Sequence, residues 1–182
     1  MREIEIKARV AKPAELHKRL SALDVVLNPP KKQHDIVYSL PGAQDNQPEA
    51  NWLRIRIEND TTNIFTLKRS VSGELDSIEH EVTFDDVDEL TKIIGYLGYE
   101  LFSDLTKIRR KAKYGDIEIC VDELPGLGNF IEVEKLCEED ADYASVAAEL
   151  WQLFSKLGIT RADEETHGYD VLMRAHEDSN DA

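Results

Sequence analysis

The sequence predicts an α+β fold in which eight antiparallel strands close into a β-barrel and amphipathic helices pack on the outside. Eight segments are predicted to be extended, most of them alternating apolar and charged residues with the period of two of a strand, and three other segments repeat apolar residues at helical spacing. The helices need apolar surface, so we expect them on the apolar faces of the strands, with the charged faces lining the barrel. Closure would also remove exposed strand edges. An open sheet with a solvated charged face is the alternative that periodicity leaves open.

The strands are predicted from alternation and from short turns between consecutive segments. In the first strand, over residues 2–10, Glu3, Glu5 and Lys7 alternate with apolar residues. Short connections between the later strands indicate antiparallel meanders. The stretch 41–51 is rich in loop-forming residues and is predicted as a loop. The remaining strands are predicted over 33–40, 52–57, 63–69, 77–84, 104–114, 116–124 and 129–136.

Three helices are predicted from their apolar stripes and end signals. The first covers about 13–24, with a proline suited to a first helical position. The second begins after Asp86, which resembles a capping residue, and stops at Gly98. The third covers about 143–157, and a loop plus a short helix is expected over 160–175. We therefore expect one domain over 1–175 and an acidic, disordered tail over 176–182.

Composition restricts the partners of the protein. The chain has 182 residues, with 37 Asp and Glu against 22 Lys and Arg and a net charge of −15. Such a surface repels nucleic acid and anionic membranes, so any bound anion must meet cations gathered in one place. The sequence shows no signal-peptide pattern and no long apolar run, which favours the cytoplasm. Cys120 and Cys137 are interpreted as small buried hydrophobes, and the five histidines show no metal-ligand spacing.

The charges on the predicted strands are sorted by sign, which is more order than solubility requires. Three strands carry Glu-x-Glu pairs and others carry paired Arg or Lys residues. Carboxylates at i and i+2 of a strand converge, and such hard oxygen ligands suit Mg²⁺ or Mn²⁺. Arg and Lys on neighbouring strands would bind phosphate oxygens. The pattern therefore indicates a site for a metal-bound polyphosphate.

These residues resemble the motifs of the CYTH, or triphosphate tunnel metalloenzyme, superfamily. The opening Glu3-Ile-Glu5-Ile-Lys7 is similar to its ExExK signature, and QHDIVYSL, with Asp35 and Tyr38, is similar to its second strand. His-Gly replaces the usual Ser before Tyr169 in the C-terminal element HGYDVLM. The resemblance implies a closed eight-stranded tunnel and is greatest to the class IV adenylyl cyclase-like branch. The other matching segments are LRIR, TLKR, IEHE, KIRR, VDELPGLGNF and IEVE.

The resemblance also implies roles for individual residues. Ligands of Mg²⁺ or Mn²⁺ would be Glu3, Glu5, Asp122, Glu132 and Glu134. Residues binding the triphosphate would be Lys7, Arg54, Arg56, Lys68, Lys107 and Arg109. Catalytic groups would be Lys7, Lys107, Arg109 and Asp122. A supporting role inside the barrel would fall to Glu79 and Glu81, either of which would orient Arg or Lys side chains, help hold a second metal ion or position water.

The predicted function is a divalent-metal-dependent enzyme that acts on a small-molecule triphosphate. The branch implies conversion of ATP to cyclic AMP and pyrophosphate, and the alternative is hydrolysis of inorganic triphosphate or of an organic triphosphate such as thiamine triphosphate or a nucleotide. A module that binds polyphosphate or nucleotide without turnover is the alternative from another class. The carboxylates favour an enzyme, since a pure anion binder would gain by losing them. No long nucleic acid and no membrane is expected as a partner, and the resemblance allows a homodimer.

Overall fold

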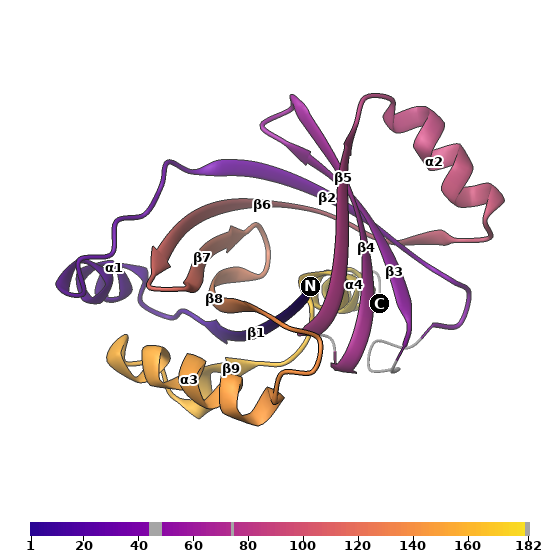
Figure 1. Cartoon of the computed structure of the whole chain (residues 1–182). Coiled ribbons are helices and arrows are strands. Elements are labelled where there is room, and N and C mark those ends of the chain that lie inside the picture. The colour runs from indigo at the N-terminus through magenta and orange to yellow at the C-terminus, as the bar shows by residue number, and fades with distance from the viewer. Residues whose placement is uncertain (44–48, 74, 181–182) are drawn as a thin grey trace. The chain divides into compact units, whose positions relative to one another are not determined.

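The structure is a computed structural model that describes residues 1–43, 49–73 and 75–180 (Figure 1). The chain divides into two compact units. The first unit comprises Met1–Lys31 and Ile108–Thr166, and the second comprises Lys32–Lys107 and His167–Ala182. One long strand, β6 (Glu100–Tyr114), contributes its N-terminal part to the second unit and its C-terminal part to the first.

The first unit is an antiparallel sheet with two helices and a short 3-10 turn. Its strands follow the order β9-β1-β8-β7-β6, with β8 paired to both β1 and β7. The sheet elements are β1 (Arg2–Arg9), β7 (Ile117–Leu124), β8 (Gly128–Cys137) and β9 (Glu164–Glu165). The helical elements are α1 (Pro13–Ala22), α3 (Tyr143–Lys156) and η1 (Arg161–Asp163).

One face of this sheet is apolar and is covered by helices, as the sequence predicts. Alternation along β1 and β8 puts isoleucine and valine on this face, where Ile6 and Val133 are buried. The helices contribute residues such as Leu20 of α1 and Phe154 of α3 to the same core cluster. The other face of β1, β7 and β8 is left for the charged residues, which therefore point away from the helices.

The second unit is an antiparallel sheet in the order β5-β4-β3-β2-β6, with β3, β4 and β5 lying side by side (Figure 1). A core cluster around Leu53 and Ile55 of β3 includes Ile94 of α2. Asp86 caps α2, accepting a hydrogen bond of 2.9 Å from the backbone N–H of Glu89. The elements are β2 (Lys31–Ser39), β3 (Asn51–Glu58), β4 (Thr62–Gly73), β5 (Asp76–Phe84), α2 (Val87–Tyr96) and α4 (Tyr169–Asn180).

The structure differs from the sequence prediction in one short strand and at the ends of several elements. Strand β9 was not predicted, because two residues are too short to show a period. Strand β6 begins at Glu100 rather than at 104. Residues 176–180, predicted to belong to a disordered tail, continue α4, while 181–182 and positions 44–48 of the predicted loop lie outside the described residues. The boundaries of a single domain over 1–175 stay a prediction.

No helix within the described part of the chain is long and apolar enough to cross a membrane.

Candidate functional site

Three predicted metal ligands of the first unit converge on its charged face. Glu3, Glu5 and Glu134 each offer a carboxylate oxygen, and these oxygens lie within 4.8 Å of one another. Glu5 and Glu134 are direct partners across β1 and β8, so the register brings two carboxylates together. Like charges opposite each other destabilise a sheet unless a cation or a proton neutralises them. The convergence therefore fits a metal ion with oxygen ligands.

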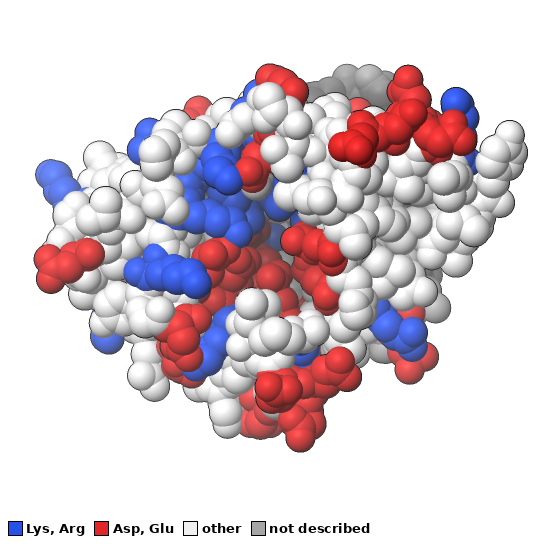
Figure 2. Space-filling view, turned by 45° about the horizontal axis from the view of Figure 1, so that its top comes forward, with Lys and Arg blue, Asp and Glu red and all other residues white. Residues whose placement is uncertain are grey.

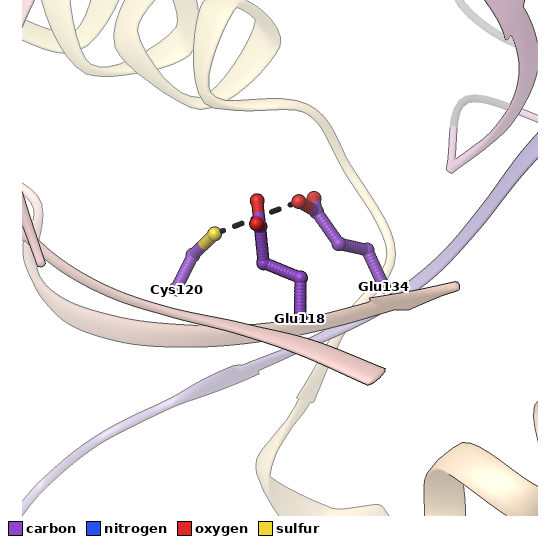
Figure 3. Close-up of side chains that lie close together, drawn as sticks. All are labelled: Glu118, Cys120 and Glu134. Atoms are coloured by element: carbon purple, nitrogen blue, oxygen red, sulfur yellow. Dashed lines mark hydrogen bonds between the residues drawn. The ribbon is translucent and has the colours of Figure 1, made fainter. Parts of the chain in front are cut away.

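A second group of potential ligands shares Glu134. Glu118, Cys120 and Glu134 place donor atoms within 4.8 Å of one another, and their side chains rise from the same side of β7 and β8 (Figure 3). The thiol of Cys120 lies 3.7 Å from Glu134 Oε1. The prediction that Cys120 is a buried free cysteine is confirmed, but its neighbours are charged rather than apolar. Burial raises the pKa of this thiol, and the thiol therefore stays protonated at neutral pH.

The side chains of Glu134 and Glu118 are joined by a hydrogen bond. Burial raises the pKa of Glu134 well above its usual value, and the negative charge of Glu3 and the hydrogen bond to Glu118 raise it further. Burial would also raise the pKa of Glu118, but hydrogen bonds from Glu134 and Lys111 lower it. These opposite directions favour a protonated Glu134 beside an ionised Glu118. A cation would replace the proton as the neutralising charge.

Arg109 is held by two of the remaining predicted site residues. Its Nε donates to Asp122 Oδ1 at 2.8 Å, and its Nη2 donates to carboxylates of both Asp122 and Glu132. Burial lowers the pKa of Arg109, but these two carboxylates raise it well above its usual value, so it stays charged. Lys7 lies 3.5 Å from Glu132 and 3.6 Å from Glu5. Asp122 and Glu132 thus contact cations, and their metal role stays a prediction.

In the second unit, two predicted phosphate-binding residues meet one carboxylate. Arg56 donates to Asp35 through both Nε and Nη2, each at 2.7 Å, and Lys107 Nζ lies 3.8 Å from Asp35 Oδ2. All three side chains are buried. Burial alone would raise the pKa of Asp35, but Arg56 and then Lys107 lower it far below its usual value. Asp35 is therefore ionised and fixes the guanidinium of Arg56.

The other charged residues of this unit form a second group on β3, β4 and β5. Arg54 Nη2 lies 3.1 Å from Thr66 Oγ1 and 3.2 Å from Glu81 Oε1. Lys68 Nζ pairs with Glu79 Oε1 at 2.8 Å, and Glu79 also lies 3.8 Å from Arg54. Glu79 and Glu81 therefore orient cations here, which is one of the supporting roles the sequence predicts. Figure 2 shows one face of the molecule, on which Lys and Arg side chains form one group and Asp and Glu side chains form another beside it.

Sequence reasoning left three site residues without a role. The sequence marks Asp35 only as part of a motif, although its position opposite Arg56 across β2 and β3 makes it a natural partner. Glu118 lies opposite Glu134, and Thr66 lies opposite both Arg54 and Glu81. Only the strand register shows these pairings, because alternation assigns a face but not a partner.

The charged residues of the first unit suit a divalent cation. Carboxylates outnumber cations on this face, and carboxylate oxygens are the ligands that Mg²⁺ and Mn²⁺ prefer. These carboxylates are Glu3, Glu5, Glu118, Asp122, Glu132 and Glu134, and the cations that pair with members of this group are Lys7, Arg109 and Lys111.

Known proteins resemble this chain over most of its length. A Methanocaldococcus jannaschii protein named "Putative adenylate cyclase MJ0240" is 27% identical over 166 residues, which cover 88% of this chain and 92% of that protein. The solved structure of "a putative adenylate cyclase" from Vibrio parahaemolyticus has a TM-score of 0.79 at 20% identity, covering 94% of this chain and 97% of that one. The solved structure of a "Putative adenylyl cyclase" from Hippeastrum, described as having a dominant triphosphatase activity, has a TM-score of 0.57 at 19% identity, covering 92% of this chain and 91% of that one.

The structural likeness confirms the predicted fold class. The fold is the closed eight-stranded antiparallel β-barrel with helices outside it, to which this chain adds the short strand β9. The model of the CYTH domain matches residues 1–169, which include the carboxylates of β1 and β8, the basic strands and the start of α4. With fold, motifs and family model in agreement over nearly the whole sequence, the chain belongs to the CYTH domain family.

Proposed function

We propose that this protein is a divalent-metal-dependent enzyme that converts ATP to cyclic AMP and pyrophosphate. The convergence of Glu3, Glu5 and Glu134 on the charged face of the first unit carries the proposal. These three carboxylates would give the metal a set of oxygen ligands, and Lys7 Nζ lies 3.6 Å from Glu5. The names of the Methanocaldococcus and Vibrio proteins support cyclisation as the reaction.

The proposed reaction divides the charged residues by task. Glu3, Glu5 and Glu134, joined by Asp122 and Glu132, would hold Mg²⁺ or Mn²⁺, which offsets charge at phosphorus when bound. Asp122 holds the guanidinium of Arg109 in place, and the positive charge of this group would attract phosphate oxygens. The ribose 3′-hydroxyl would attack the α-phosphorus and release its proton to solvent, while the bond from the α-phosphorus to pyrophosphate breaks. Further contacts to the phosphates would come from Lys7, Arg54, Arg56, Lys68 and Lys107.

Hydrolysis of a triphosphate is the second candidate. The dominant triphosphatase activity of the Hippeastrum protein favours it. Hydrolysis uses the same carboxylates and cations, but water attacks the terminal phosphorus, and no nucleoside has to be bound. A module that binds triphosphate without turnover is the remaining alternative.

Phosphorus NMR with product identification separates these candidates. The purified chain is incubated with Mg²⁺ or Mn²⁺ and either ATP or inorganic triphosphate. Pyrophosphate and cyclic AMP from ATP are the expected products. Orthophosphate from inorganic triphosphate, with ATP nearly untouched, would replace the cyclase with a triphosphatase. Binding of either compound in calorimetry without any product would contradict the enzyme and support a binding module.

A further inference from the structure

The ammonium group of Lys107 lies against the ring of a tyrosine from the C-terminal helix. Lys107 Nζ is 4.7 Å from the ring centroid of Tyr169, the first residue of α4, and 3.8 Å from Asp35 Oδ2. Lys107 is 3% exposed and Tyr169 is 7% exposed. The three residues belong to the second unit, but they come from three separate elements, β2, β6 and α4.

This arrangement restricts where the ammonium can lie. A lysine side chain has a flexible stem that loses much conformational freedom when it is fixed. An aromatic face attracts a cation and limits its approach to one direction, and the attraction is stronger where water is excluded. Asp35 already accepts two hydrogen bonds from Arg56. The ring therefore adds a second fixed surface that defines the position of Lys107.

We propose that Tyr169 is a positioning residue that holds Lys107 where it binds a phosphate group of the substrate. This inference rests on the proposed function, because it assumes that Lys107 binds triphosphate. The ring face is what acts, so the hydroxyl of Tyr169 is not needed. Phenylalanine at position 169 should therefore keep Lys107 in place, whereas an aliphatic residue there should not.

The contact is tested first without activity. In the isotope-labelled full chain, the ε-CH₂ resonances of Lys107 should be shifted upfield by the ring current and assigned by their absence in Lys107→Arg. The upfield shift should persist in Tyr169→Phe and disappear in Tyr169→Leu. A Leu172→Ala variant, which trims a half-buried residue of the same helix, should keep it. If the shift were also lost in Leu172→Ala, the position of Lys107 would depend on the general packing of α4 rather than on the ring of Tyr169. That result would overturn the proposal.

The consequence for the substrate is tested with the same variants. In Tyr169→Leu, the KM for the triphosphate substrate and its calorimetric Kd should both rise by about tenfold, with a smaller change in kcat. Tyr169→Phe and Leu172→Ala should stay close to the unmodified protein. Unchanged KM and Kd in Tyr169→Leu would overturn the positioning role even if the ring-current shift is lost.

Failure of the proposed function gives a different pattern. If the unmodified protein neither binds nor converts a triphosphate, the substrate role of Lys107 and the positioning role of Tyr169 both fall. The ring-current shift would still appear in that case, so a missing substrate is distinguished from a missing contact.

Discussion

Glu134 is the residue whose replacement separates metal binding from folding, because it belongs to both groups of convergent ligands. Glu134→Gln keeps the size of the side chain and removes its ability to bind a divalent cation as a carboxylate. Burial already favours the neutral form of Glu134, so the amide should leave the free energy of unfolding nearly unchanged. Metal-dependent turnover, measured by phosphorus NMR, should fall by about a hundredfold or more.

The matched control is Glu123→Gln on the neighbouring strand. Glu123 is exposed and lies one residue from Asp122 on β7, so its side chain points to the opposite face. The same loss of one carboxylate should leave turnover unchanged. Full activity in Glu134→Gln would show that the metal ligands have been assigned wrongly.

Asp35 gives a residue-scale prediction about pH. Its pKa in the folded protein lies below the ordinary value of 3.8, so its ionised form stabilises the fold above that pH and the contribution is lost as the pH falls further. At pH 7, Asp35→Asn should lower the free energy of unfolding by roughly 3 kcal/mol, because Arg56 loses the carboxylate of a buried pair. Urea unfolding should show the gap between the two proteins narrowing below about pH 4.

An exposed aspartate provides the comparison for this measurement. Asp140→Asn should track the unmodified protein from pH 7 down to the lowest pH at which both still fold. If the gap caused by Asp35→Asn stayed constant across this range, ionisation of Asp35 would not be the source of its stabilisation.

At the scale of an element, Gly95 in α2 and Gly98 just after its C-terminal end should change stability in opposite directions when replaced by alanine. Gly95 lies within the helix and has open space where a Cβ would be added, so Gly95→Ala should raise the free energy of unfolding by about 0.5 kcal/mol. Gly98 ends the helix with φ of +86°, a left-handed conformation that alanine adopts only with strain. Gly98→Ala should therefore lower the free energy of unfolding by about 1 kcal/mol. Denaturant unfolding measures the change in the free energy of unfolding for each variant. Changes of the same sign would contradict the assigned end of α2.

The elements themselves were largely predictable from sequence, whereas their partners were not. Strong alternation in β1 and helical spacing in α3 each repeat over enough residues to exceed chance. Strand β9 has no period to detect. The candidate ligands Glu3, Glu5 and Glu134 could be named from residue type and motif, but their convergence depends on register. The surroundings of Cys120 also depend on register, because its neighbours in sequence are apolar whereas Glu118 and Glu134 lie close to it in the structure.

At the scale of the whole molecule, the net charge of −15 sets the background against which a bound metal must be recognised. Repulsion among the excess carboxylates destabilises the compact state, and any salt relieves part of it by screening. NaCl and MgCl₂ should therefore both raise the melting temperature. At equal ionic strength, only a specific metal site should raise the melting temperature further. A ligand that binds the folded state stabilises it by about 2.7 kcal/mol at a hundred times its Kd.

Thermal unfolding at matched ionic strength separates the two effects. Mg²⁺ or Mn²⁺ should raise the melting temperature of the unmodified chain and of Glu123→Gln above the value in NaCl. In Glu134→Gln the divalent and monovalent salts should act alike, because screening depends on total charge, whereas specific binding depends on the convergent carboxylates. A divalent increment that survives in Glu134→Gln would place the metal elsewhere on the acidic surface. Its loss in that variant alone would assign the stabilisation to the carboxylates of β1 and β8.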